Sequence, residues 1–494
     1  MKKFLISLCM VCAAVMVVSA RSVDEKFADA MNRADWFALD SLYDATPKDS
    51  INPFLEVFAR CLIGNRLNRT DVSLHAFREL LNTQSEYLGV ENLVSSAYMF
   101  GMDLSRVGYN AEAASMINSI LAATNQYLDS ASAAALTATA NRYAALSAYK
   151  PYQIEFPDSR EATVPFTVVP VGPADKGSVL MHLSDSYING EKADITFDTG
   201  AGANLISMEM AGKYNLVPLD SAIITVRGVN ARDGYVAMAR ELKIGDFTVR
   251  DVPFTVISLS SANEEADRYI HSFNIVVGSE LMLQLKDMTI DFSERRITVP
   301  TIACERSGDT PNLCFSSTMN LLVKGSVLDT PMLMCIDSGD ASYGSLDNSF
   351  YETNKDYITS HATLDSIRQA GIGGVIITEC YKVPCMPVII DGHAVFPSGM
   401  VVRLGDDTMI GGYECIIGVK TLMLYRKVRF NLVDFILTTE PYDDQFPMLQ
   451  SKYGVPHFRY TKEKRMNLLQ AIGCVGVGVA RTLINPNAPA DPDL

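Results

Sequence analysis

The chain contains ITFDTGA at residues 195–201 and MCIDSGD at residues 334–340. Each stretch is an apolar strand that ends in Asp-(Thr/Ser)-Gly. Two carboxylates that share one proton can activate water for hydrolysis, and a duplicated strand and turn brings such carboxylates face to face. The pattern therefore predicts a hydrolytic site built from Asp198 and Asp337.

The segments downstream of the two turns repeat as well. Asp198 and Asp337 are 139 residues apart, and an apolar-apolar-Gly element follows each of them, ending 80 residues after the first aspartate and 81 after the second. These elements are IVVG at residues 275–278 and CIIG at residues 415–418. Internal repetition at a fixed spacing indicates duplicated structural units. The repeat predicts two β-rich lobes, residues 160–300 and residues 301–440.

Four further residues are expected to support the two aspartates. Gly200 and Gly339 allow each turn to bend sharply and let another backbone segment approach closely. Thr199 and Ser338 carry hydroxyl groups that can donate hydrogen bonds across the pseudo-twofold axis and lock the turns together. An apolar strand beneath each turn would hold it rigid.

These motifs resemble those of the aspartic peptidases of the pepsin and retropepsin superfamily, in which each lobe carries hydrophobic-Asp-(Thr/Ser)-Gly and a later hydrophobic-hydrophobic-Gly. The resemblance covers residues 160–440 and implies a mainly β fold of two pseudo-symmetric β-barrel lobes. It implies that Asp198 and Asp337 hold one water molecule, with one carboxylate as base and the other protonated. It also implies a peptide or protein substrate in an extended conformation, with no cofactor and no metal.

The resemblance further implies a β-hairpin flap that closes over the substrate. In the first lobe the candidate hairpin spans residues 226–236, with Gly228 at its turn and Tyr235 as its aromatic residue. In the second lobe the candidate is GIGGV at residues 371–375, with Gly371 and Gly373 at the turn. This second stretch lacks the lysine of a phosphate-binding loop.

Asp340 departs from the family pattern, because Ala201 stands at the matching position of the first turn. A third carboxylate that faces the dyad would raise the pKa of its neighbour, whereas one that turns to solvent would not. Two functions therefore remain open. One is an active aspartic endopeptidase, and the other is an inactive relative that binds a peptide or protein without cutting it.

Residues 21–150 are expected to form an α-helical domain, because apolar residues recur three and four positions apart. Helices separated by short Gly/Asn turns loosely resemble tetratricopeptide repeats, and a plain helical bundle fits the pattern equally well. This region is a candidate for binding a protein partner. The linker that follows contains Lys150-Pro151 and Phe156-Pro157.

Residues 1–20 have the charged, apolar and small-residue regions of a signal peptide, which predicts export to the periplasm or the extracellular space. The net charge of −15 argues against nucleic-acid binding. The C-terminal extension, residues 441–494, contains an uncharged run at residues 466–480. That run is too short for a typical membrane-spanning helix, so membrane contact is not expected.

The cysteine pattern allows up to three disulfides in an oxidising compartment. A bond between Cys335 and Cys415 is one specific expectation, because the repeat places their strands side by side. No histidines stand in a paired metal-binding spacing, which argues against zinc. The six cysteines available for such bonds lie between residues 304 and 415: Cys304, Cys314, Cys335, Cys380, Cys385 and Cys415.

Overall fold

The computed structural model describes residues 22–172, 177–227, 231–259, 270–302, 304–328, 330–371, 374–405 and 413–442. The chain divides into two compact units, Met1–Gly89 and Val90–Leu494. The predicted signal peptide and the chain beyond residue 442 lie outside the described residues.

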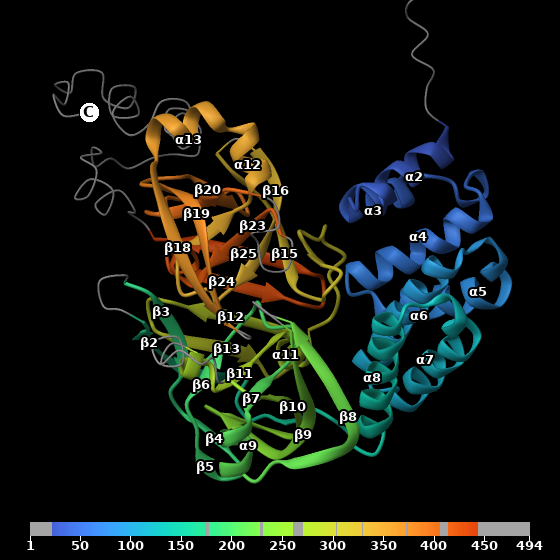
Figure 1. Ribbon diagram of the computed structural model, residues 1–494, viewed down its shortest axis with the longest axis horizontal. Coiled ribbons are helices and arrows are strands. Elements are labelled where there is room, and N and C mark those ends of the chain that lie inside the picture. Colours follow the sequence, from blue (N-terminus) through green and yellow to red (C-terminus); the bar gives the residue numbers. More distant parts are fainter. Residues whose placement is uncertain are drawn as a thin grey trace, which may run out of the picture. The chain divides into compact units, whose positions relative to one another are not determined.

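The first unit is helical (Figure 1). Ser22 and Glu25 form a capping box at the start of its first helix, and Asn52 caps another helix that begins with Pro53. These residues satisfy backbone N–H groups that the first helical turn leaves free. The described helices of this unit are α2 (Val23–Asn32), α3 (Trp36–Ala45), α4 (Pro53–Arg66) and α5 (Thr70–Thr83), with the 3-10 turns η1 (Lys48–Ser50) and η2 (Ser85–Tyr87).

The second unit begins with α6 (Val90–Arg106), α7 (Asn110–Thr124), the 3-10 turn η3 (Asn125–Tyr127) and α8 (Ser130–Leu146). The turns between paired helices share one geometry in both units, because Ala34, Asn68 and Gly108 all have positive φ, at 52°, 55° and 88°. The expected helical region is therefore present as repeated helix-turn-helix pairs. Its likeness to tetratricopeptide repeats stays a prediction.

The β-rich remainder forms two sheets, an arrangement compatible with the two lobes that the sequence predicts. The first lobe contains β1 (Gln153–Glu155), β2 (Glu161–Pro170), β3 (Val179–Leu183), β4 (Ser186–Ile188), β5 (Glu191–Lys192), β6 (Ile195–Phe197), β7 (Leu205–Ser207), α9 (Met208–Lys213), β8 (Val217–Arg227), β9 (Ala231–Ile244), β10 (Phe247–Ile257), η5 (His271–Phe273), β11 (Ile275–Val277), α11 (Ser279–Leu285), β12 (Asp287–Asp291) and β13 (Arg296–Pro300).

The second lobe repeats much of this order. It contains β14 (Leu313–Phe315), β15 (Leu321–Val327), β16 (Thr330–Asp337), β17 (Gly344–Leu346), α12 (Asn348–Thr353), α13 (Lys355–His361), β18 (Thr363–Gly371), β19 (Gly374–Val383), β20 (Val388–Ile390), β21 (His393–Val395), β22 (Met400–Arg403), β23 (Cys415–Gly418), α14 (Val419–Leu422), β24 (Tyr425–Asn431) and β25 (Ile436–Pro441).

Both lobes use the same strand arrangement around their Asp-Gly turn. In the first lobe, β11 runs parallel to β6 and antiparallel to β7. In the second, β23 runs parallel to β16 and antiparallel to β17. The apolar-apolar-Gly element therefore forms the strand beside each aspartate, as the repeat predicts.

The two lobes share a sheet. Strand β12 of the first lobe pairs with β24 of the second, in a register that places Ile290 opposite Val428. Both side chains are fully buried. The interface between the lobes thus combines main-chain hydrogen bonds with a continuous apolar core.

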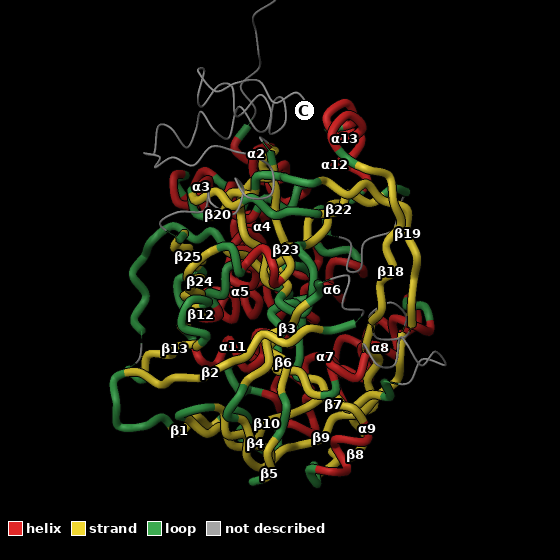
Figure 2. The backbone as a smooth tube through the Cα atoms, turned by 90° about the vertical axis from the view of Figure 1, so that its left-hand side faces the viewer, coloured by secondary structure: helices red, strands yellow, loops and turns green. Residues whose placement is uncertain are grey.

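Each lobe also carries a long antiparallel hairpin, β8–β9 in the first and β18–β19 in the second. Figure 2 shows β18 and β19 as two long strands that run side by side. The hairpins lie in the sequence positions where the resemblance implies flaps.

The disulfide expectation is wrong for the described cysteines, because no disulfide forms between them. Strand register explains the failure of the Cys335–Cys415 pairing. Cys335 lies opposite Ile416, and Cys415 lies opposite Met334. Successive side chains on a strand point to opposite faces, so these two thiols leave the sheet on opposite sides.

Among the described residues, no helix is both long and apolar enough to cross a bilayer. The same residues contain no group of three or more His, Cys, Asp or Glu side chains placed to hold a metal ion.

Candidate active site

Asp198 directly follows strand β6, and hydrogen bonds to the backbone fix its position. Its amide donates to the carbonyl oxygen of Val277 on β11 at 3.0 Å. Its Oδ1 accepts from the amides of Gly200 at 2.8 Å and Ala201 at 3.2 Å. The carboxyl group is therefore held by its own turn, with its other oxygen left for different partners.

Asp337 ends β16 and is bound in the same way. Its Oδ1 accepts from the amides of Gly339 at 2.9 Å and Asp340 at 3.0 Å. The residue pairs with Gly418 on the parallel strand β23. The two predicted catalytic aspartates thus occupy equivalent places in the two lobes.

Thr199 and Ser338 interlock the two turns. The amide of each residue donates to the hydroxyl oxygen of the other, at 3.0 Å from Thr199 and 2.9 Å from Ser338. The Thr199 hydroxyl donates to the Ile336 carbonyl oxygen at 2.7 Å, and the Ser338 hydroxyl donates to that of Phe197 at 2.8 Å. Each hydroxyl therefore donates once and accepts once across the boundary between the lobes.

Gly200 and Gly339 bring the aspartates together. A Cβ atom on Gly200 would overlap the carboxyl group of Asp337, and one on Gly339 would overlap that of Asp198. Each carboxyl group also influences the pKa of the other. Only glycine at both positions allows each turn to lie against the aspartate of the opposite lobe.

The proximity of the aspartates changes their titration. Burial is the largest cause that raises the pKa of Asp198 above its ordinary value. For Asp337, burial and then the negative charges of Asp198 and Asp340 raise the pKa well above its ordinary value. Two carboxyl groups this close retain one proton between them, since ionising both would place like charges in contact.

Asp340 is half-buried, and its carboxylate is held within its own loop. Its Oδ1 accepts from the amide of Ser342 at 2.9 Å and from the hydroxyl of Ser342 at 2.7 Å. Its charge still acts on the dyad, because it is one of the causes that raise the pKa of Asp337. The sequence difference at this position therefore makes the two halves of the site electrostatically unequal.

The predicted flap residues lie at different positions along the two hairpins. Tyr235 lies near the base of the first hairpin, and Gly371 lies at the end of the second. Tyr235 on β9 lies opposite Ile223 and Val256, where the first hairpin joins the body of the lobe, and it packs against the core. Gly371 lies opposite Gly374 at the end of the second hairpin. The other two predicted flap positions, Gly228 and Gly373, lie outside the described residues.

The sequence reasoning missed two polar side chains that hold the first turn. The amide group of Asn320 donates to the carbonyl oxygen of Gly200, and Oδ1 of Asn320 accepts from the Tyr413 hydroxyl at 2.8 Å. Asn204 is fully buried, and its Oδ1 accepts from the Gly278 amide at 3.0 Å. Each of these two residues directly precedes an apolar strand, a position that many ordinary polar residues share.

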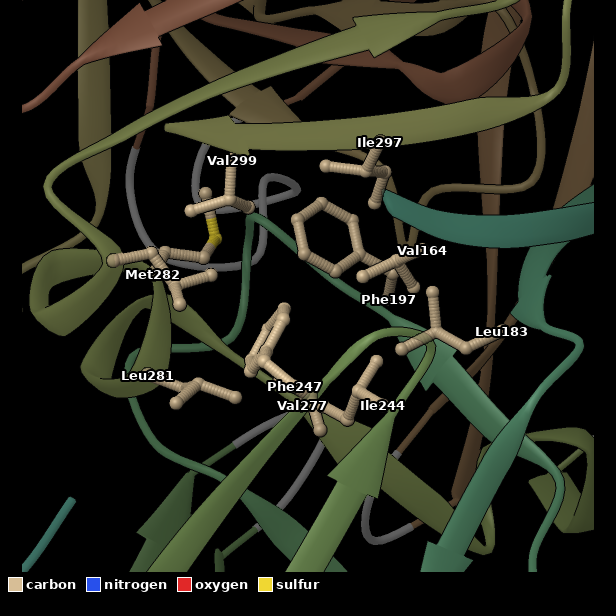
Figure 3. A pocket seen from close by; sticks show the side chains of 11 residues that line it. Val164, Leu183, Phe197, Ile244, Phe247, Val277, Leu281, Met282, Ile297 and Val299 are labelled. Carbon is tan, nitrogen blue, oxygen red and sulfur yellow. The ribbon is translucent and has the colours of Figure 1, made fainter. Parts of the chain in front are cut away.

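An apolar cavity lies beside Phe197, the residue before Asp198 (Figure 3). Its volume is about 20 Å³. Its lining is apolar and offers no polar partner for an ordered water molecule. We regard it as a packing gap of the first lobe. Its lining consists of Val164, Leu183, Phe197, Ile244, Phe247, Val277, Leu281, Met282, Leu285, Ile297 and Val299.

A comparison with known protein families finds a match within the first lobe. Residues 184–265 match the model of the family described as "gag-polyprotein putative aspartyl protease". This match includes Asp198 and supports the resemblance to the aspartic peptidase superfamily.

A crystal structure of a retropepsin-like aspartic protease from Rickettsia conorii is 17% identical in sequence. The alignment covers 31% of this chain and 94% of that chain, with a TM-score of 0.19. No match was found among curated proteins.

Proposed function

We propose that this chain is an exported aspartic endopeptidase in which Asp198 and Asp337 activate one water molecule. One observation carries the proposal. The glycine of each turn packs against the aspartate of the opposite lobe, so the two carboxyl groups share one small space. A fold that needed the turns for structure alone would have no reason to force two carboxyl groups into contact, because that contact costs free energy.

In the proposed mechanism, the ionised carboxylate accepts a proton from the water as the water oxygen attacks the peptide carbonyl carbon. The protonated carboxyl group donates its proton to the carbonyl oxygen. When the tetrahedral intermediate collapses, the C–N bond breaks, and the amine nitrogen takes the proton that the base had accepted from water. One hydroxyl group of the intermediate returns a proton to the carboxylate that had acted as acid, so the dyad is regenerated. The Asp340 carboxylate lies in the turn of Asp337 and raises the pKa of that residue, which supports Asp337 as the initial acid and Asp198 as the base.

The β8–β9 and β18–β19 hairpins support a peptide substrate in an extended conformation. Both are long antiparallel ribbons attached to the lobe bodies, and such hairpins can close over a bound strand and exclude water. Gly371 and Tyr235 are the described residues of these hairpins that we assign to substrate binding.

The test uses Asp198→Asn and Asp337→Asn in the full chain. Each variant is compared with wild type on a peptide library, with products identified by mass spectrometry. Asp356→Asn is the matched control, because Asp356 is exposed on α13. Cleavage should be lost in both dyad variants and kept in the control. Cleavage by either dyad variant at the wild-type rate would refute the proposal.

A peptide mimic with a hydroxyl group at the scissile position separates catalysis from binding alone. A working dyad should bind this mimic more tightly than the matching substrate, because the hydroxyl stands in for the attacking water. If wild type binds peptides equally well with and without the hydroxyl and releases no product at any pH, the chain is a peptide-binding relative.

The proposal also includes two further points: the protein is exported, and its helical region binds a protein partner. The sequence of residues 1–20 supports cleavage after Ala20 and a periplasmic or extracellular site of action. Mass spectrometry of the N-terminus of the protein from its native host would test this. A mature protein that retains residues 1–20 would contradict export by a cleaved signal.

A further inference from the structure

A chain of polar contacts begins on helix α8 and enters the first lobe. Arg142 forms an ion pair with Glu280, the second residue of α11. The Tyr152 hydroxyl donates to Oε2 of Glu280 at 2.9 Å and accepts from Nδ2 of Asn204 at 3.1 Å. One continuous path of side chains therefore joins the helical region to a buried amide of the first lobe.

The path ends at the turn that holds Asp198. Oδ1 of Asn204 accepts from the Gly278 amide at 3.0 Å. A Cβ atom on Gly278 would lie only 2.5 Å from the carbonyl oxygen of Ala201, and the next amide, that of Ser279, donates to this oxygen at 2.8 Å. Since the Ala201 amide donates to Asp198, three successive hydrogen bonds connect Asn204 to the carboxylate: Gly278 to Asn204, Ser279 to Ala201, and Ala201 to Asp198.

Tyr152, which makes two of these contacts, has an unusual backbone conformation. Its φ is 62°, a region that bulky residues rarely adopt. Burial and then the charge of Glu280 raise the pKa of Tyr152 well above its ordinary value, so its hydroxyl remains a donor. Arg142 and Glu280 are only 22% and 24% exposed, so solvent screens their attraction incompletely.

The second lobe satisfies the equivalent amide without a side-chain path. The Gly418 amide donates to the main-chain oxygen of Tyr343 at 3.3 Å. Gly344 stands at the position that matches Asn204, and Lys420 stands at the position that matches Glu280. Lys420 lies over the Tyr343 ring instead, 4.3 Å from its centroid. This difference indicates that the link to α8 is a specific feature of the first lobe.

Helix α8 also supports the first hairpin. Leu146 at its C-terminal end packs with Leu219 of β8 and with Val236 and Met238 of β9. Figure 1 shows α8 beside β8. The same helix thus contacts the base of the predicted flap and, through Arg142, the turn of the predicted catalytic aspartate.

We infer that Arg142 is a positioning residue for Asp198. It acts through Glu280, Tyr152 and Asn204, so the peptidase needs helix α8 for full activity. The inference rests on the proposed peptidase function. Arg142 has no role in the proton transfers. It keeps the first turn in the geometry that the reaction needs, since a misplacement of about 1 Å at a reacting group can reduce the rate about 100-fold.

The test compares Arg142→Met with Arg142→Lys, which keeps a positive charge on α8 and leaves Glu280 as the acceptor for the Tyr152 hydroxyl. Arg142→Met should lower kcat about tenfold and change KM less than about twofold. Arg142→Lys should keep most of the wild-type kcat, because it preserves a cation opposite Glu280. Arg60→Met is the matched control, since it removes a similarly buried ion pair to Glu56 in the first unit. This control should keep the wild-type kcat.

Hydrogen exchange of the amides in residues 199–207 and 275–282 provides a readout without activity. Arg142→Met should speed exchange there, whereas Arg60→Met should not. If wild type is active but Arg142→Met keeps the wild-type kcat, or Arg142→Lys loses as much kcat as Arg142→Met does, the inference is refuted and the proposed function stands. If wild type shows no peptidase activity, the proposed function fails. The path from Arg142 to the turn of Asp198 is tested separately: it is refuted if amide hydrogen exchange in Arg142→Met equals that of wild type.

Discussion

Thr199 and Ser338 bind each other across the lobe boundary through two reciprocal hydrogen bonds, of 3.0 Å and 2.9 Å. The two residues are 139 positions apart in the chain. Both side chains are fully buried, so water cannot replace these bonds if one is lost. The relative position of the two aspartates therefore depends on a pair of hydroxyl groups as well as on the apolar core.

Thr199→Val should destabilise the protein. The substitution keeps the side-chain shape but leaves the Ser338 amide and the Ile336 carbonyl oxygen without partners, which should lower the free energy of unfolding by about 2 kcal/mol. Urea denaturation measures this change. Thr199→Ser keeps the hydroxyl and is the control. A Thr199→Val protein as stable as Thr199→Ser would show that the reciprocal bonds do not hold the lobes.

Gly200→Ala should separate the two carboxyl groups. The added methyl group would overlap the Asp337 carboxyl group, so one turn must move, and kcat should fall about 100-fold or more. Gly212→Ala in helix α9 is the control, because a Cβ atom there meets no atom within 4 Å. Equal activity in the two variants would contradict the close approach on which the proposed function rests.

The sequence predicted the architecture of the lobes because the relevant signals are local. The Asp-Gly turns, the apolar-apolar-Gly strands and their common offset all lie within short segments, and each segment folds as its pattern predicts. The pairing of β12 with β24 has no such signal. It joins strands 140 residues apart, and only the packed lobes bring them together.

The side chains that support the two aspartates were also hard to predict, because their partners lie far away in the chain. Asn204 and Asn320 act on partners 74 and 120 residues away, and nothing local distinguishes them from ordinary polar residues at strand ends. The failed Cys335–Cys415 pairing shows a related limit. The sequence places the two strands together, but a register shift of one residue decides which face each thiol occupies.

Asp337→Asn should stabilise the folded protein near neutral pH. The folded-state pKa of Asp337 is raised, so its stabilising contribution is complete below the unfolded-state pKa of about 3.9 and is lost as the pH rises through the folded-state pKa. An amide does not ionise and avoids this loss. The melting temperature of the variant should exceed that of wild type at pH 7, and the difference should vanish in acid. A lower melting temperature than wild type at pH 7 would contradict the direction of the shift.

Asp340→Asn should move the pH profile of peptide cleavage. The Asp340 carboxylate is a like charge that raises the pKa of Asp337, and the amide of asparagine retains an oxygen that can accept from Ser342. Removing the charge lowers the pKa of Asp337, so the shared proton is lost at lower pH. Since cleavage needs one proton on the dyad, the alkaline limb of kcat/KM should move to lower pH.

The measurement is kcat/KM against pH at low and high salt, with Asp356→Asn as the control that removes an exposed negative charge. The control should leave the alkaline limb in place. The shift in Asp340→Asn should persist in high salt, because half-buried charges are screened less than exposed ones. If the limb stays in place or moves to higher pH, Asp340 does not act on the dyad through its charge. In that case the rise in the pKa of Asp337 must come from burial and from Asp198 alone.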